Sequence, residues 1–128
     1  MSKYFEAEGR SKFENITIDN MYASLCEGTV DVPGNYSPLI SIGPDIDLKN
    51  INISNIVRNE THCPMPTIGI ELNSTVENLS VSNCVQTNET KRPIPFLYNE
   101  GKINKFNSFN IELGNDALLG GEGEIVTE

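Results

Sequence analysis

The sequence has no tryptophan, one histidine and three cysteines among its 128 residues. Three scattered cysteines are too few for the disulfide framework of a small secreted domain. The lone His62 stands beside Cys63, and without further spaced ligands this pair is weak evidence for a metal site. Sugar subsites usually include an aromatic platform, so the absence of tryptophan weakens the case for one.

Positive charge is also scarce, with 9 Lys+Arg against 18 Asp+Glu and a formal net charge of −9. Nucleic acids and anionic membranes need clustered cations, so we expect neither as a partner. No apolar run approaches the ~18 residues of a membrane span. Residues 1–6 lack the apolar core of a signal peptide, and the sequence does not indicate a compartment.

What the chain does have is an ordinary globular composition, 38% hydrophobic with 10 glycines, and an internal repeat. Four nine-residue segments share one template, in which positions 1, 4, 6 and 9 are apolar and position 8 is asparagine. They cover 13–21, 48–56, 76–84 and 103–111, at intervals of 35, 28 and 27 residues. The one exception is Ser108, at an otherwise apolar position 6. A fixed repeat of this kind is typical of solenoid folds.

A short segment with strand-like alternation precedes each copy of the repeat. These segments are 4–8, 39–42, 67–70 and 96–98, and Gly9, Gly43 and Gly101 close three of them. No stretch has a sustained 3.6-residue apolar period, so we expect strands and no helices. Strands of successive repeats would pair in parallel at about 4.8 Å, with equivalent apolar residues stacked in inward columns.

The position-8 asparagines suggest a second regularity. Asparagine tolerates the left-handed backbone of a sharp bend, and stacked side-chain amides can hydrogen-bond from one repeat to the next. We therefore predict a bend and an asparagine ladder at four residues: Asn20, Asn55, Asn83 and Asn110.

The pattern apolar-x-Asn-apolar-x-apolar-x-Asn-apolar, preceded by a glycine-closed strand, resembles the right-handed parallel β-helix of the pectin-lyase-like superfamily. Over 4–111 it is most similar to the C-terminal coils of glycoside hydrolase family 28 (polygalacturonase-type) proteins. The resemblance implies an all-β, single-domain chain (1–128) of about four coils. Because strand-like residues begin at Tyr4 with no capping helix before them, we expect the solenoid to be truncated at its N-terminal end. The expected coils are 4–38, 39–66, 67–95 and 96–112, with 113–128 as a capping tail. A leucine-rich repeat is the alternative, but its asparagine falls one residue later and its period is constant.

The resemblance does not extend to a catalytic site. Hydrolases of the family share an Asn-x-Asp, an Asp-Asp pair and a Gly-His-Gly on neighbouring coils, with an Arg-x-Lys beside them, and we expect all four motifs to be missing from this chain. Asp45 and Asp47 come closest to the Ca²⁺-binding aspartates of the related pectate lyases, and we interpret them as solvated turn residues. Glu6 and Glu8 are interpreted as a charged outer face. We assign no catalytic, cofactor-binding or metal-binding residue.

The other candidates concern packing and modification. Cys84 occupies an inward position and is predicted to be a small core residue, whereas Cys26 and Cys63 fall in successive loops and are left open as a disulfide pair. Seven Asn-x-Ser/Thr sequons occur. Those expected in loops, and so open to glycan in a eukaryotic secretory host, are Asn35, Asn59, Asn73 and Asn88.

Outward positions 5 and 7 form a flat, mostly uncharged face, suited to sugar hydroxyls, to a second subunit or to solvent alone. Its members are Thr17, Asn52, Ser80 and Asn107, then Asp19, Ser54, Ser82 and Phe109. We expect a β-helix module of a carbohydrate-active, glycosidase-like protein that is inactive on its own, with polysaccharide as its partner. The alternative is a non-catalytic β-solenoid that binds glycan or self-associates through an open N-terminal end.

Overall fold

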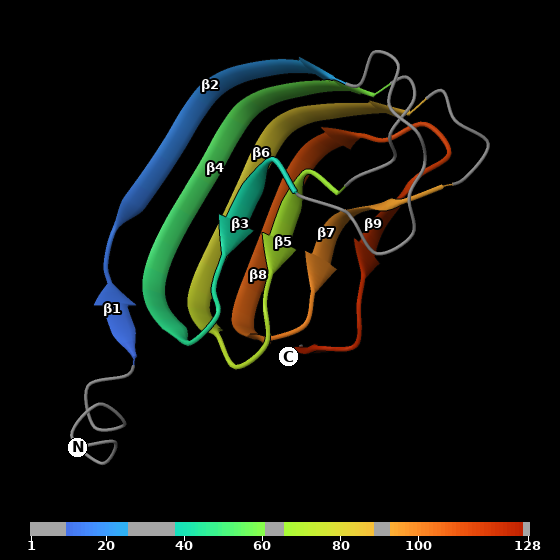
Figure 1. The fold of residues 1–128 in the computed structure, drawn as a ribbon. Coiled ribbons are helices and arrows are strands. Elements are labelled where there is room, and N and C mark those ends of the chain that lie inside the picture. Colours follow the sequence, from blue (N-terminus) through green and yellow to red (C-terminus); the bar gives the residue numbers. More distant parts are fainter. Residues whose placement is uncertain (1–9, 26–37, 61–65, 89–92, 127–128) are drawn as a thin grey trace.

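The computed structural model describes residues 10–25, 38–60, 66–88 and 93–126, and within these ranges the chain is all-β. Ten strands and no helix occur there, as the alternating pattern predicts. No helix of this part of the chain is therefore available to cross a membrane. The strands form two parallel sheets, which we call the long sheet and the short sheet (Figure 1).

The long sheet contains the repeat. Its strands are β1 (Ser11–Phe13), β2 (Ile16–Leu25), β4 (Ile46–Glu60), β6 (Thr75–Asn88), β8 (Lys102–Glu112) and β10 (Glu124–Ile125). Both β1 and β2 pair with β4, and the order continues through β6 and β8 to β10. We call β4 and β6 the inner strands, and β2 and β8 the outer strands.

The short sheet faces the long one across the interior, in the order β3-β5-β7-β9 (Figure 1). Its strands are β3 (Ile40–Ile42), β5 (Ile68–Ile70), β7 (Pro95–Asn99) and β9 (Ala117–Gly120). Each strand pair in both sheets is parallel, because the connection through the opposite sheet supplies the crossover that parallel pairing needs. The architecture is compatible with a β-solenoid.

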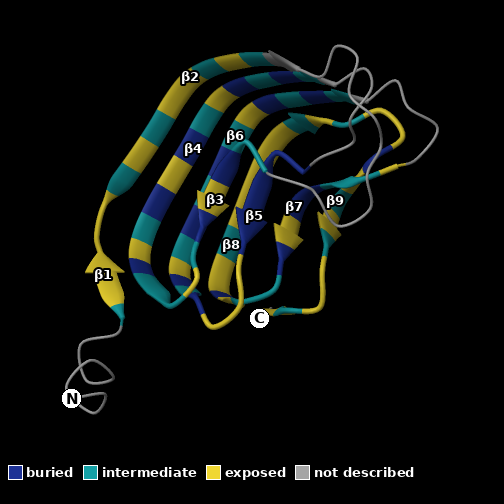
Figure 2. Cartoon of the chain, viewed as in Figure 1, coloured by how far each residue is buried: buried dark blue, intermediate teal, exposed yellow. Residues whose placement is uncertain are grey.

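The register confirms the predicted columns. Ile51 pairs with Ile16 on one side and Leu79 on the other, and Leu79 pairs with Phe106, so position 4 is continuous through the sheet. Positions 1 and 6 align in the same way. Equivalent positions of the repeat thus lie beside one another from strand to strand, and in the long sheet the buried residues are concentrated on β4 and β6 (Figure 2).

The core consists of these columns and the inward residues of the short sheet. Its buried hydrophobic members are Ile40, Ile42, Leu48, Ile51, Ile53, Ile56, Ile68, Ile70, Val76, Leu79, Val81, Cys84, Phe96, Leu97 and Ile103. Most of those in the long sheet belong to the inner strands, whereas Ile16 and Phe106 on the outer strands are only partly buried. Phe13 of β1 is 45% exposed although it shares a column with Val76, which is 0% exposed.

The bend at position 8 is confirmed by the backbone. The four asparagines have φ of 67°, 56°, 55° and 58°, in the left-handed region that asparagine tolerates better than other side chains. The strands continue on both sides of this residue, which explains why each long strand is strongly curved (Figure 1).

The predicted ladder at position 8 is only partly formed. Asn110 Nδ2 donates to Asn83 Oδ1 at 2.9 Å, but Asn55 Nδ2 donates to Asp19 Oδ1 at 2.8 Å instead of to a neighbouring asparagine. The carboxylate of Asp19 attracts the amide because an ionised acceptor makes the stronger hydrogen bond.

A more continuous ladder lies at position 3 of the repeat. Asn78 Nδ2 donates to Asn50 Oδ1 at 2.8 Å, and Asn50 Nδ2 donates to Asn15 Oδ1 at 3.0 Å. Side-chain amides therefore join β6 to β4, and β4 to the residue between β1 and β2, in addition to the backbone hydrogen bonds of the strands. We call these three residues the position-3 ladder.

Candidate functional site

Asp45 lies in the turn before β4, as the sequence predicts, whereas Asp47 lies in β4 and its assignment to a turn is wrong. Both residues accept hydrogen bonds from side-chain donors. Asp47 accepts two hydrogen bonds from Arg10, at 2.5 Å from Nη2 and 3.0 Å from Nε. This fork lowers the pKa of Asp47. Asp45 Oδ1 accepts from Asn73 Nδ2 at 2.6 Å. Within the described ranges, no group of three or more His, Cys, Asp or Glu residues is arranged to hold a metal ion.

The expectation that all four family motifs are missing is wrong for one of them, because Arg10-Ser11-Lys12 is an Arg-x-Lys. The structure places Ser11 and Lys12 in β1 and engages Arg10 with Asp47 as an ion pair. The guanidinium is therefore neutralised by a neighbouring strand. An isolated pair of cations also lacks the two carboxyl groups that glycoside hydrolysis requires.

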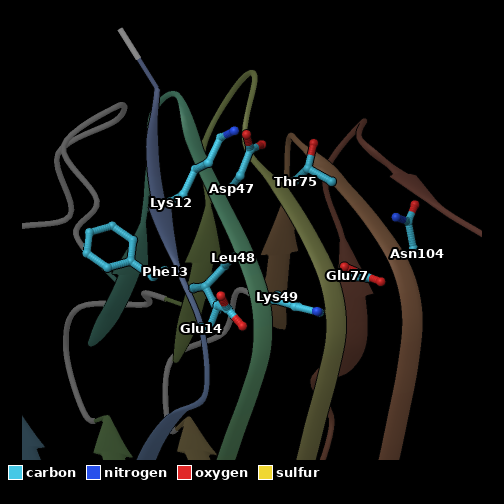
Figure 3. A pocket seen from close by; sticks show the side chains of 9 residues that line it. All are labelled: Lys12, Phe13, Glu14, Asp47, Leu48, Lys49, Thr75, Glu77 and Asn104. Carbon is cyan, nitrogen blue, oxygen red and sulfur yellow. The ribbon is translucent and has the colours of Figure 1, made fainter. Parts of the chain in front are cut away.

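The described part of the chain contains a shallow hollow of about 290 Å³ at the beginning of the long strands (Figure 3). It is lined by Lys12, Phe13, Glu14, Asp47, Leu48, Lys49, Thr75, Glu77 and Asn104. Its charges alternate between strands: Glu14 on the chain beside β1, Lys49 on β4 and Glu77 on β6. Mixed charges at an exposed position do not concentrate a potential of either sign, so the hollow favours no class of charged ligand.

The outer face of the long sheet has two sets of polar residues that bond one another. One is the position-3 ladder. The other is centred on Asp19, whose Oδ1 accepts from Ser54 Oγ and Asn55 Nδ2, both at 2.8 Å. These hydrogen bonds lower the pKa of Asp19 and keep it ionised. Many of the side-chain donors and acceptors of both sets are therefore already hydrogen-bonded within the protein.

The column between them is different. Position 5 is occupied by Thr17, Asn52, Ser80 and Asn107, which align strand by strand. No side-chain hydrogen bond involves these four residues in the part of the chain that the structure describes. Thr17, Asn52 and Asn107 are exposed and Ser80 is half-buried. We call this set the position-5 column; its hydroxyl and amide groups remain available to a ligand.

An aromatic side chain lies on the same face. Phe109 is two residues after Asn107 in β8, on the same side of the strand, and is 73% exposed. Tyr22, 68% exposed on β2, lies beyond the bend, and its hydroxyl accepts a hydrogen bond from Asn59 Nδ2 at 3.0 Å. Phe109 thus combines with the position-5 column into a surface with hydrogen-bonding groups and one stacking platform, and this surface is the candidate site.

A buried polar cluster was missed by the sequence analysis. Gln86 accepts a hydrogen bond from Thr67 Oγ1 at 2.5 Å and donates to Asp116 Oδ2 at 2.9 Å. Arg58, on β4 in register with Gln86, donates to the carbonyl of Pro66 at 2.9 Å and is 0% exposed. The sequence does contain a signal for this cluster. Arg58 and Gln86 each stand two places after the inward position 9, and alternate residues of a strand point to the same side. The cluster is enclosed by the protein and offers no surface to a ligand.

One of the remaining sequence candidates, Cys84, lies in the described part of the chain, and five others do not. Cys84 is buried and its Sγ lies 3.3 Å from the carbonyl oxygen of Ser82, which confirms it as a core residue. Burial raises the pKa of its thiol. Five candidates fall outside the described residues: Glu6, Glu8, Cys26, His62 and Cys63.

The loop assignment of two sequons is wrong. Asn59 lies in β4 and Asn88 is the last residue of β6, because the pairing of these strands continues through Asn59↔Thr87 and Glu60↔Asn88. Asn73 does lie in a turn and is exposed, with φ of 64°. Asn35 falls outside the described ranges.

Comparison with known proteins adds no relative: no family model, no curated protein and no solved structure matches the chain.

Proposed function

We propose that this chain is a right-handed parallel β-helix module, of about four coils, from a carbohydrate-active protein of the pectin-lyase-like type. The support is the repeat template, whose apolar columns align in register through parallel strands. The left-handed asparagine at position 8 of each template segment supports the same assignment. A leucine-rich repeat, the sequence alternative, would place its asparagine one residue later.

Within such a protein, this stretch binds glycan and does not cleave it. The observation that carries the proposal is the position-5 column, four uncharged polar side chains without internal hydrogen bonds, next to the exposed ring of Phe109. Sugars are bound by hydrogen bonds to their hydroxyls and by stacking of their apolar faces on aromatic rings. The chain's charge of −9 and the ionised Asp19 disfavour an anionic ligand, so a neutral glycan is the better partner.

Affinity electrophoresis of the full chain through gels that contain soluble neutral polysaccharides tests this function. We expect retardation in at least one such gel and none in polygalacturonate. Phe109→Ala should abolish the retardation, whereas Leu72→Ala, a matched control that removes another large exposed side chain (65% exposed), should leave it unchanged. Unretarded migration in every gel, or release of oligosaccharides from polygalacturonate by this chain alone, would contradict the proposal.

A scaffold that self-associates is the second candidate, and the outer strands favour it. In the described part of the chain, β2 pairs only with β4, and β10 covers β8 only at Lys102 and Ile103. Unpaired strand edges with partly exposed apolar side chains are templates for addition of another chain. Light scattering on a size-exclusion column tests it: a concentration-independent monomer excludes the scaffold without affecting the glycan proposal.

A further inference from the structure

The position-5 column has a direction, and that direction specifies how a glycan would lie. Its members pair in unshifted register, Thr17 with Asn52, Asn52 with Ser80, and Ser80 with Asn107. The column therefore runs across the strands, perpendicular to the chain direction, with a step of about 4.8 Å. This step is close to the length by which one hexopyranose extends a straight polysaccharide chain.

We infer that the ligand is an extended, neutral, β-1,4-linked polysaccharide that lies across the long strands, with consecutive sugars on consecutive members of the position-5 column. This inference rests on the proposed glycan-binding function and adds the ligand class, the orientation and the number of subsites. Four column members define four subsites, and their outermost side chains lie about 14 Å apart. A coiled or sharply branched glycan would leave the straight column after one or two sugars.

Each subsite offers uncharged groups that both donate and accept. Serine and threonine hydroxyls do so through one oxygen, and an asparagine amide through its oxygen and nitrogen. A sugar hydroxyl has the same dual capacity, so it can pair with any of the four side chains. The neighbouring columns do not compete, because the position-3 ladder and Asp19 are already engaged.

Phe109 fixes one end of the site. It lies on β8 beside Asn107, so the sugar at the β8 end would stack on the ring while it bonds the amide. Thr17, at the opposite end on β2, is three strands away. A ligand that runs along β8 instead would use Asn107 and Phe109 but would never reach Thr17. The two orientations therefore differ at this threonine.

Calorimetric titration of the full chain with β-1,4-gluco-oligosaccharides of two to six residues separates these cases. We expect affinity to rise with each added sugar up to four residues and then to level off. Thr17→Val, which keeps the β-branched shape and removes the hydroxyl, should weaken the tetrasaccharide three- to tenfold and leave the disaccharide unchanged. Thr75→Val, at the charged hollow, is the matched control and should change neither affinity.

The outcomes distinguish the orientation from the function. Affinity that is independent of length beyond two sugars, or a Thr17→Val variant that binds like the parent, would overturn the transverse orientation while Phe109→Ala still abolished binding. A preference for oligogalacturonate over the neutral series would overturn the ligand class. Loss of all binding in the parent chain contradicts the proposed function itself. Circular dichroism of each variant identifies any that fails to fold, and Ser80→Ala then replaces it as the test of the column.

Discussion

The inner and outer strands of the long sheet share one template but differ in burial. Position 4 is an apolar side chain in all four, yet Ile51 and Leu79 on the inner strands are 2% and 0% exposed, while Ile16 and Phe106 on the outer strands remain partly exposed. Each inner strand is covered by a neighbour on both sides, and each outer strand lacks one over most of its described length. The template thus determines which way a side chain points, and the place of its strand in the stack determines how much it contributes.

The largest difference is expected from removal of equivalent core side chains. Leu79→Ala should lower the free energy of unfolding by about 3–4 kcal/mol, because it leaves a cavity beneath a strand that has a neighbour on both sides. Ile16→Ala on β2 should lower it by about half as much or less, because solvent and local relaxation fill the space. Urea denaturation of both variants measures the difference. Equal losses would mean that the outer strand is covered as fully as the inner one.

The next effect concerns the bend at position 8. Asn83→Ala should destabilise the protein by about 1–2 kcal/mol, since alanine is disfavoured at φ of 55° and cannot accept the hydrogen bond from Asn110. Asn83→Gly loses the same hydrogen bond without the backbone strain. The glycine variant should therefore be the more stable of the two in thermal or urea unfolding. The opposite order would mean that the left-handed backbone at Asn83 does not penalise alanine, and would contradict the role of this asparagine in the bend.

A smaller effect separates the members of the position-3 ladder. Asn50→Ala on β4 removes two side-chain hydrogen bonds of the ladder, and Asn78→Ala on β6 removes one. At about 0.5 kcal/mol for each partly exposed bond, the expected losses are ~1 and ~0.5 kcal/mol in urea denaturation. Identical losses would indicate that the two bonds of Asn50 do not contribute separately.

The smallest effect is the pH dependence of the contact that joins the β1 end of the chain to β4. The hydrogen bonds from Arg10 lower the pKa of Asp47. A carboxyl with a lowered pKa stabilises the fold above its unfolded value of about 3.9, and this stabilisation is lost as the pH falls through the lower, folded value. Asp47→Asn should flatten the stability profile below pH 4, and 1 M salt should weaken the effect in the parent. A parent profile that coincides with that of Asp47→Asn would exclude the contact as a source of stability.

The sequence predicted the columns and the bend because both depend on like residues at a fixed interval. The repeat interval and the alternation of inward and outward residues were enough to align position 4, which is occupied by Ile16, Ile51, Leu79 and Phe106. Contacts between unlike residues were not accessible in this way. The forked pair of Arg10 and Asp47 joins residues at unequal positions of two repeats, and no periodic signal connects them.

Arg58 illustrates the second limit of sequence interpretation. Its charge predicts an outward side chain, but the structure buries it, because the carbonyl of Pro66 accepts from its guanidinium within the interior. That carbonyl comes from the segment before β5, whose position no local pattern specifies. For the candidate site, the sequence identified the outward residues but did not show which of them hydrogen-bond one another.

The side-chain amides of the position-3 ladder all point the same way, from Asn78 to Asn50 to Asn15. Aligned amide dipoles add, as they do along an α-helix, so this short series has a positive pole at Asn15 and a negative pole at Asn78. The residue that pairs with Asn78 on the next strand is Lys105, a cation that only donates. This series of amides therefore has a direction along the axis of the stack. A neighbouring segment beyond Asn78 is stabilised by a cation at the paired position, and one before Asn15 by an anion.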